Sequence, residues 1–302
     1  MNKRADIKTG FLCNNNCLFC VQADNKCVGN RSFEDIKKDI IDTSKRCDSI
    51  VLTGGEVTIR KDFLDIVSFA KSLGFKTIQI QTNARMFSDF NFAKKTVTAG
   101  ANEFAPALHG FCSEQHDFLT NANGSFKQTV KGIINLKKLN QKVITNTVIT
   151  RSNYESLPKI TNLLVKLKVD QIQLAFVHHL GNAKKKFYML TPKMSMTIKY
   201  IQESIRIAKK HDTNIMIEAI PMCILGKYYE FASEFYIPET EIRGVKSQNT
   251  NNYKKIRVEQ GKIKFSKCLE CIYNNICEGP WREYPIMLSD KEFVPIKSKN
   301  EL

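Results

Sequence analysis

The chain lacks the apolar stretches that a membrane protein needs. Apolar runs such as Ile50–Leu52 and Val143–Ile144 are far shorter than the ~20 residues of a membrane-spanning helix. Behind the charged residues of the N-terminus, Met1–Asp6, no apolar segment typical of a signal peptide follows. We therefore expect no membrane association and a cytoplasmic location.

Acidic residues are scarce relative to basic ones. The 302 residues include 30 acidic and 46 basic side chains, for a net charge of +16, and 42% of the residues are hydrophobic. These numbers are typical of a globular protein with one large α/β barrel or two ordinary domains. A basic surface attracts anions, but the lysines are scattered and form no stripe interleaved with aromatic residues, so we do not expect nucleic-acid binding. We find no internal repeat and no low-complexity tract.

Cysteine, by contrast, is abundant. Six of the ten cysteines fall into two tight groups, one near residue 15 and one near residue 270. In a reducing cytosol, tight groups of this kind indicate metal sites rather than disulfides.

Apolar and polar segments alternate at the spacing of βα units. Strands are expected at 6–12, 49–53, 77–82, 103–108, 142–149 and 171–177, and helices at 33–45, 63–73, 90–99, 126–139, 154–167 and 192–211. Six such units in series predict an α/β fold, with a parallel sheet in an open or closed barrel and helices outside it.

The pattern changes after residue 211. A further strand is expected at 214–220, and residues 221–302 then mix Pro, Gly, Asn and the second cysteine group. We expect residues 1–212 to form the barrel and residues 213–302 a small loop-rich domain. A segment with so little core of its own often depends on a bound metal.

The first cysteine group is Cys13-Asn-Asn-Asn-Cys17-Leu-Phe-Cys20, directly after the first expected strand. In a barrel, active sites lie at the C-terminal ends of the strands. Three thiolates on a short loop can hold three irons of a [4Fe–4S] cluster and leave the fourth iron open to a small molecule. Zinc is the alternative, but structural zinc wants four ligands, and only Cys27 is a local candidate for the fourth.

This motif resembles that of the radical S-adenosylmethionine (SAM) superfamily, C-x₃-C-x-aromatic-C, with Phe19 at the aromatic position. The resemblance implies a partial (β/α)₆ barrel, matching the six expected units. It also implies that SAM is cleaved reductively to methionine and a 5′-deoxyadenosyl radical.

Other segments support this resemblance. Thr53-Gly54-Gly55-Glu56 follows the second expected strand, about 35 residues after Cys20, and in the family such a segment holds the amino group of SAM; a simple turn is the alternative. Gly54 and Gly55 would let the backbone approach a ligand.

Thr82-Asn83-Ala84 resembles a Thr-Asn-Gly segment near SAM, and because Ala84 replaces glycine we expect a different turn. Asn146 either faces SAM from inside the barrel or faces outward.

A further spacing resembles the branch of the family with SPASM or twitch extensions. Leu108-His109-Gly110 ends the fourth expected strand, and His116-Asp117 and Gly124-Ser125-Phe126 follow it. His109 stands where that branch often has Asp, so it is a candidate for substrate contact or proton transfer; a structural role is the alternative. His178 and His179 end the sixth expected strand, and we assign no metal to them.

The second cysteine group, Cys268-x₂-Cys271-x₅-Cys277, resembles the centre of the SPASM motif. The position where that motif has a further cysteine is Trp281, so a single auxiliary [4Fe–4S] cluster fits better than two, with Cys223 as the expected fourth ligand. Without Cys223 the cluster would have an open iron for substrate. A zinc knuckle built from the same cysteines is the alternative.

Within this branch we favour an enzyme that modifies a peptide or protein, supplied with electrons by a reductant such as flavodoxin or ferredoxin. The alternative is an enzyme of small-molecule or cofactor biosynthesis. Little chain before Cys13 is available for peptide recognition, which weakens the first choice, and the C-terminus lacks the Gly-Gly tail of the molybdopterin-precursor cyclase. A non-catalytic iron–sulfur or zinc protein that binds nucleic acid would have no use for Gly54-Gly55-Glu56.

Overall fold

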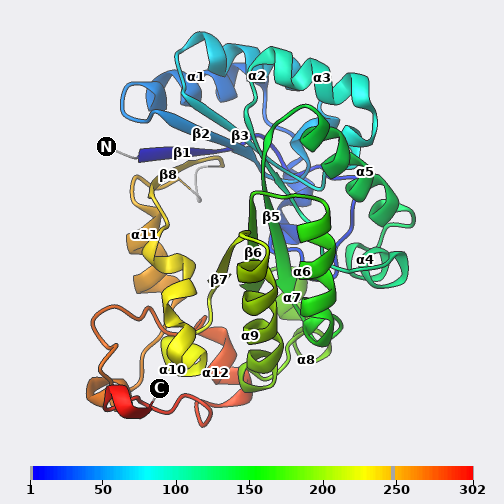
Figure 1. Ribbon diagram of the computed structural model, residues 1–302. Helices are drawn as coiled ribbons and strands as arrows, with labels where there is room; N and C mark the ends of the chain where they lie inside the picture. Colours follow the sequence, from blue (N-terminus) through cyan, green and yellow to red (C-terminus); the bar gives the residue numbers. More distant parts are fainter. Residues whose placement is uncertain (1–2, 246–248, 302) are drawn as a thin grey trace.

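The structure, a computed structural model, describes residues 3–245 and 249–301. Its centre is a sheet of eight parallel strands in the order β7-β6-β5-β4-β3-β2-β1-β8. Figure 1 shows this sheet curled into a half-barrel with helices on its outer side. The strands are β1 (Lys3–Lys8), β2 (Ser49–Thr53), β3 (Thr77–Thr82), β4 (Glu103–Pro106), β5 (Lys142–Ile149), β6 (Gln171–Phe176), β7 (Asn214–Glu218) and β8 (Glu239–Arg243).

Helices connect the strands and cover the convex face (Figure 1). The helices are α1 (Phe33–Ser44), α2 (Phe63–Ser72), α3 (Phe90–Ala99), α4 (Ser113–Thr120), α5 (Ser125–Lys138), α6 (Leu157–Lys166), α7 (Asn182–Lys185), α8 (Phe187–Leu190), α9 (Met194–Lys210), α10 (Met222–Leu225), α11 (Tyr253–Ile256) and α12 (Glu283–Leu288). The predicted partial (β/α)₆ barrel is confirmed, and β2, β3 and β5 have the predicted bounds.

Capping and amphipathic patterning explain the outer helices. The Ser32 hydroxyl accepts a hydrogen bond from the Asp35 amide at 3.1 Å at the start of α1, and Asp89 caps α3 in the same way. Ile36 and Ile40, one turn apart on α1, are fully buried. Each helix therefore presents one apolar side to the sheet.

The first strand is shorter at its C-terminal end than predicted. β1 ends at Lys8, where the prediction continued to Leu12. After Lys8 only the Thr9 amide still bonds β2, at the Thr53 carbonyl (2.8 Å), and the Phe11 amide turns to Gly29 (2.9 Å). The cysteine loop therefore leaves the sheet earlier than predicted, beside the end of β2.

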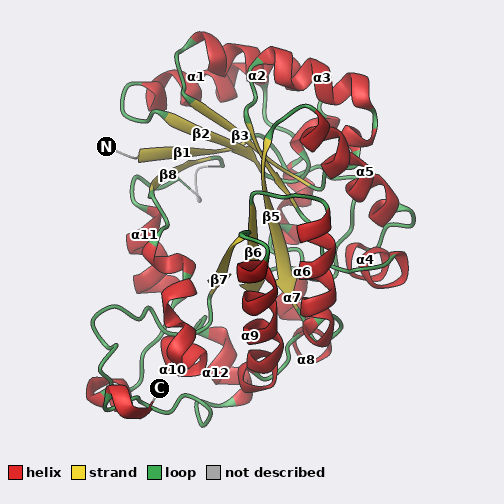
Figure 2. Ribbon diagram, viewed as in Figure 1, coloured by secondary structure: helices red, strands yellow, loops and turns green. Residues whose placement is uncertain are grey.

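The C-terminal part of the chain supplies both edges of the sheet. β7 pairs with β6, and β8 pairs with β1. Beyond them the chain consists mostly of loops and short helices (Figure 2). The division into domains at residues 212 and 213 stays a prediction, but two of the eight strands come from beyond it.

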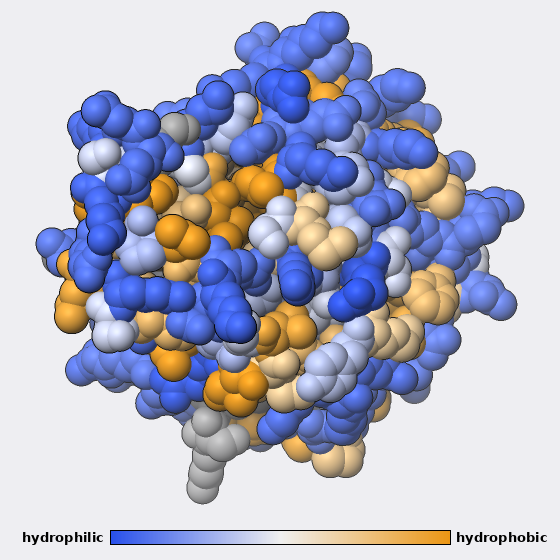
Figure 3. Space-filling model, turned by 90° about the horizontal axis from the view of Figure 1, so that it is seen from below, coloured by the Kyte–Doolittle hydropathy of each residue, from blue (hydrophilic) through white to orange (hydrophobic). Residues whose placement is uncertain are grey.

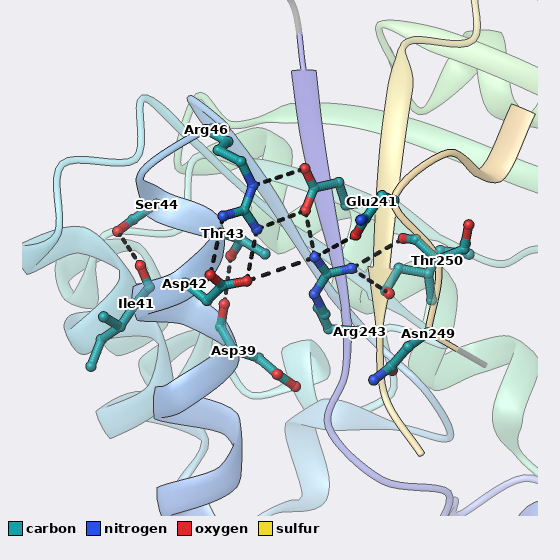
Figure 4. A network of polar contacts seen from close by, with 12 residues as sticks. Asp39, Ile41, Asp42, Thr43, Ser44, Arg46, Glu241, Arg243, Asn249 and Thr250 are labelled. Carbon is teal, nitrogen blue, oxygen red and sulfur yellow. Dashed lines mark hydrogen bonds and ion pairs between the residues drawn. The ribbon is translucent and has the colours of Figure 1, made fainter. Parts of the chain in front are cut away.

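A buried carboxylate holds β8 in place. Glu241 of β8 is 1% exposed and contacts three cations: Lys3 at 2.6 Å, Arg243 at 2.8 Å and Arg46 at 3.1 Å. Figure 4 shows Arg46 and Arg243 converging on this carboxylate from the end of α1 and from β8. Because removing one partner of a buried charge group is strongly destabilising, this network fixes β8 against β1.

No helix among the residues that the structure describes is long and apolar enough to cross a membrane.

Candidate active site

The three cysteines of the first group line one pocket of about 400 Å³ at the C-terminal ends of the strands. Burial raises the pKa of the Cys13 thiol to about 11 and that of Cys17 to about 12, and in both cases nearby thiols raise it further. Buried thiolates need a compensating positive charge, which a bound metal supplies. The donor set therefore fits a metal cluster on the wall of the pocket. Cys27 is exposed and lies outside this lining.

The cysteine loop is held by segments from distant parts of the chain. The Asn182 side chain at the start of α7 donates to the Cys17 carbonyl at 3.1 Å, and the Leu18 amide donates to Leu119 of α4 at 2.9 Å. Arg85 donates to the Asn14 carbonyl at 2.5 Å and to the Asn15 side chain at 2.8 Å. Sequence reasoning missed Arg85, although its place directly after Thr82-Asn83-Ala84 was a signal.

Gly54 and Gly55 let β2 approach the cysteine loop closely. A Cβ at Gly54 would lie 2.1 Å from the Gly10 carbonyl oxygen, and one at Gly55 would lie 2.2 Å from the Leu12 carbonyl oxygen. The amides of Gly55 and Glu56 each donate to that loop at 2.8 Å. The two glycines thus allow contact between two backbones, whereas the sequence suggested contact with a ligand. Both also line the pocket.

Glu56 is buried and lines the pocket. Its Oε1 accepts hydrogen bonds from Thr58 (amide at 3.2 Å, hydroxyl at 2.5 Å) and from the Thr82 hydroxyl at 2.7 Å. Its Oε2 accepts from the Asn83 amide at 2.6 Å. Burial raises the pKa of Glu56, and these bonds oppose that shift. With one donor on Oε2, this oxygen keeps an acceptor position for a cationic group in the pocket.

The segment after β3 also reaches the pocket, where Thr82 and Asn83 are lining residues. The Asn83 side chain donates to Asn14 of the cysteine loop at 2.6 Å. Ala84 has φ of 61°, in the left-handed region that favours glycine. The alanine thus adopts a glycine-like conformation, and a turn that differs from that of the family stays a prediction.

Asn146 of β5 lines the pocket, so it faces the interior of the barrel; its contact with SAM stays a prediction. Its Oδ1 is buried and has no hydrogen-bond partner among the described residues. Because a buried acceptor is normally satisfied, this atom is suited to a ligand donor.

His109 is buried and lines the pocket. Its Nδ1 accepts from the Val148 amide at 3.1 Å, and its ring packs edge-on against Phe19 with centroids 4.6 Å apart. Burial and nearby His116 lower its pKa well below the usual value. His109 is therefore a neutral imidazole at physiological pH; a catalytic role for it stays a prediction.

One side of the pocket is formed by β6, β7 and the C-terminal segment, and its lining includes His178, Glu218, Tyr253 and Trp281. Sequence reasoning named His178 and Trp281 without giving them a role in the site, and it missed Glu218 and Tyr253. His178 stacks on Trp281 with ring centroids 3.7 Å apart and an interplanar angle of 6°. The one available signal was Trp281, which occupies a position expected to be cysteine.

The second cysteine site is smaller. Cys223, Cys268, Cys271 and Cys277 line one cavity of about 30 Å³. Burial, reinforced by the other three thiols, raises the pKa of Cys223 to about 12. The fold thus brings Cys223 to the three later cysteines.

Neither cysteine group has the geometry of a single-ion site. Among the described residues, no three His, Cys, Asp or Glu side chains are placed so as to hold one metal ion. The choice between an iron–sulfur cluster and zinc at the second site therefore rests on metal analysis.

Comparison with known proteins gives one family match. The family described as "Radical SAM superfamily" matches residues 7–164. This range contains the first cysteine group, Glu56 and Asn146, and ends before Cys223.

Curated relatives carry the name probable GTP 3′,8-cyclase. One from Saccharolobus islandicus is 31% identical over 183 residues, covering 58% of this chain and 57% of the relative. One from Sulfurisphaera tokodaii is 27% identical over 222 residues, covering 69% of each chain. The match thus spans little more than half the length of the first of these relatives.

Two similar solved structures are SuiB of Streptococcus suis and anSMEcpe. SuiB bound to S-adenosylmethionine has a TM-score of 0.67 at 18% identity, covering 97% of this chain and 76% of SuiB. The anSMEcpe structure with bound AdoMet has a TM-score of 0.56 at 15% identity, covering 71% of this chain and 63% of that protein. At these identities the likeness concerns the fold.

Proposed function

Because this chain belongs to the radical SAM superfamily and is a radical SAM enzyme, we propose that Cys13, Cys17 and Cys20 hold its [4Fe–4S] cluster and that its substrate is a peptide or protein. The assignment of the cluster to these cysteines is supported by one observation: the three thiols and Glu56 line the same pocket. A protein that only binds nucleic acid has no need of such a site.

A [4Fe–4S] cluster held by Cys13, Cys17 and Cys20 and reduced by an external donor would supply the electron for cleavage of SAM to methionine and a 5′-deoxyadenosyl radical. The free acceptor position on Glu56 Oε2 would bind the amino group of SAM, and the unpaired Oδ1 of Asn146 would accept a hydrogen bond from a ribose hydroxyl of SAM. Thr58, Thr82 and Asn83 fix the Glu56 carboxylate. Phe19 packs beside the pocket against His109 and excludes water there.

We assign a second [4Fe–4S] cluster to Cys223, Cys268, Cys271 and Cys277. Four thiolates complete the coordination of such a cluster, so its role would be structural or electron transfer. The cavity that these residues share supports the assignment. The reductant would be a flavodoxin or ferredoxin.

The peptide substrate is supported by the extent of the likeness to SuiB. That likeness covers 97% of this chain, including the C-terminal cysteine segment, and SuiB has been solved bound to its precursor peptide SuiA. The alternative, small-molecule or cofactor biosynthesis, is supported by the relatives named probable GTP 3′,8-cyclase, which match 58–69% of this chain.

The molecular surface offers room for a larger partner. Figure 3 shows apolar side chains gathered in the middle of the face seen from below, with hydrophilic side chains around them. In the C-terminal part, Leu269, Ile286 and Val294 are 66–78% exposed. Exposed apolar surface of this kind often serves contacts between proteins.

Anaerobic, reconstituted enzyme tests the proposal. With dithionite and SAM, we expect 5′-deoxyadenosine, and we expect a mass change in a peptide encoded by a short reading frame beside the gene. GTP should be left intact. Consumption of GTP in step with 5′-deoxyadenosine, with no peptide modified, would favour the small-molecule alternative.

A further inference from the structure

One wall of the pocket carries a carboxylate without an ion-pair partner. Glu218 ends β7, is half-buried and lines the pocket. Its Oε2 accepts from the Gln173 side chain on β6 at 2.5 Å. In the described part of the chain, no lysine, arginine or histidine nitrogen lies within ion-pair distance of it. Glu56 approaches the pocket from β2, with four strands between β2 and β7 in the sheet.

Behind Glu218 lies a buried group of four charges. Arg257 contacts Glu234 at 2.8 Å and Glu278 at 2.9 Å, and Lys262 lies 3.8 Å from Glu234. Glu218 also acts electrostatically on both cations. Three carboxylates thus face two cations, and one negative charge remains uncompensated. Burial lowers the pKa of Lys262 to about 8 and raises the pKa of Glu278, so it weakens one cation and one carboxylate of this group alike.

Two lysines also line the pocket, Lys8 and Lys26. The Lys26 ammonium lies at the cysteine loop, where it donates to the Asn16 side chain at 2.9 Å. Lys8 of β1 lines the pocket, but its ammonium lies 3.2 Å from the Asp6 carboxylate on the same strand. This pair is neutral as a unit. Glu218 is therefore the carboxylate that exposes an uncompensated negative charge to the pocket.

Apolar side chains line the pocket on the strands between β2 and β7. They are Val148 of β5 and Ala175 and Phe176 of β6. Lysine and arginine side chains combine an apolar stem with a charged head. A side chain of this shape would place its stem along these residues and its head at Glu218.

We propose that Glu218 binds the ammonium or guanidinium head of a lysine- or arginine-like substrate group. This inference deepens the proposed function, on which it rests, by naming the substrate's chemistry. It also disfavours a nucleoside triphosphate, whose negative charges would meet a wall of the same sign.

Calorimetric titration of the reconstituted, SAM-loaded enzyme provides the test. The probes are acetylated and amidated Gly-Lys-Gly, Gly-Arg-Gly and Gly-(Nε-acetyl-Lys)-Gly, together with agmatine and GTP. The sole tryptophan of the chain is Trp281, in the pocket wall, so its fluorescence reports whether a probe binds there. We expect a charged probe to bind about tenfold more tightly than its acetylated counterpart. Preference for the peptides identifies a peptide source, and preference for agmatine a small amine; both support the inference.

Variants locate the effect. Glu218→Gln should abolish the preference for charge, Glu218→Asp should keep part of it, and Glu203→Gln, at an exposed position of α9, should keep all of it. Iron content and circular dichroism verify folding. Equal binding of lysine and acetyl-lysine probes, an unchanged preference in Glu218→Gln, or tighter binding of GTP would overturn the inference. Modification of an uncharged peptide would do so while leaving the proposed function intact, whereas absence of 5′-deoxyadenosine would contradict the proposed function itself.

Discussion

The two cysteine sites differ in the space around them. The first places three thiols on the wall of a pocket of about 400 Å³, beside the buried carboxylate of Glu56. The second places four thiols around a cavity of about 30 Å³. Three ligands beside open space leave a coordination position for a small molecule, whereas four enclosing ligands leave none. Ligand count and free volume thus separate a reactive site from a structural or electron-transfer site.

The two sites also differ in what holds them. Gly55, Arg85 and Asn182 fasten the first cysteine loop from three separate parts of the barrel. The second site is formed by a short helix and turns, apart from Cys223, which comes from α10. We therefore expect the second site to depend on its bound group for folding more than the first does.

The largest expected effect comes from removing the first site. The triple variant C13A/C17A/C20A should form no 5′-deoxyadenosine, because the thiolates that hold the cluster are gone. Iron should fall from about eight to about four per chain, since one of two four-iron clusters remains. The matched control is Cys27→Ala, at an exposed cysteine, which should keep both activity and iron. Undiminished 5′-deoxyadenosine in the triple variant would refute the assignment.

Next in size is the loss of the second site. Cys223→Ala should lose about four irons per chain and make the C-terminal segment sensitive to protease, because a metal cross-link is lost. Adding it to the triple variant should remove the remaining iron. Iron and zinc analysis measures both, with Cys112→Ala as the control. Full iron in Cys223→Ala would mean a different fourth ligand, and one zinc with about four irons would mean a zinc knuckle.

A smaller effect is expected from changing Glu56, the buried carboxylate beside the first cysteine site. Glu56→Gln should weaken SAM binding by about 2–4 kcal/mol, as expected when a buried charge loses its counter-charge. Iron content should stay unchanged. Calorimetry of reconstituted protein measures the affinity, and Glu114→Gln, at an exposed position of α4, is the control. Equal SAM affinity would make Gly54-Gly55-Glu56 a structural turn.

The smallest effect is expected at Ala84, in the segment after β3 that reaches the pocket of the first site. Ala84→Gly and Ala93→Gly, the latter inside α3, each remove a fully buried methyl group. Only at Ala84 does glycine also relieve a left-handed conformation. Ala84→Gly should therefore cost about 1 kcal/mol less free energy of unfolding than Ala93→Gly, measured by thermal unfolding of the two variants. An equal loss in both variants would show that no strain is stored at Ala84.

The barrel and the first site could be predicted because their signals are local. A short apolar run marks β2, alternating apolar residues mark β3 and β5, and the cysteines, glycines and Glu56 stand in short contiguous motifs. The role of Gly54 and Gly55 could not be predicted in full, because the backbone that they contact belongs to another strand's loop.

The rest depends on distant contacts. β8 reads Glu-Thr-Glu-Ile-Arg, a sequence with weak strand character that is held by Lys3 and Arg46 from the other end of the chain. The stacking of His178 on Trp281 joins residues about a hundred positions apart. Neither composition nor periodicity predicts contacts between residues so far apart in the sequence.

The placement of β8 beside β1 has a consequence for synthesis on the ribosome. β1 emerges first, yet its outer neighbour β8 begins about 230 residues later. During most of translation the strand that leads into the cysteine loop therefore presents an unpaired edge, which is a template for aggregation. Chaperone binding to the nascent chain would protect this edge until β8 has been synthesised and pairs with β1.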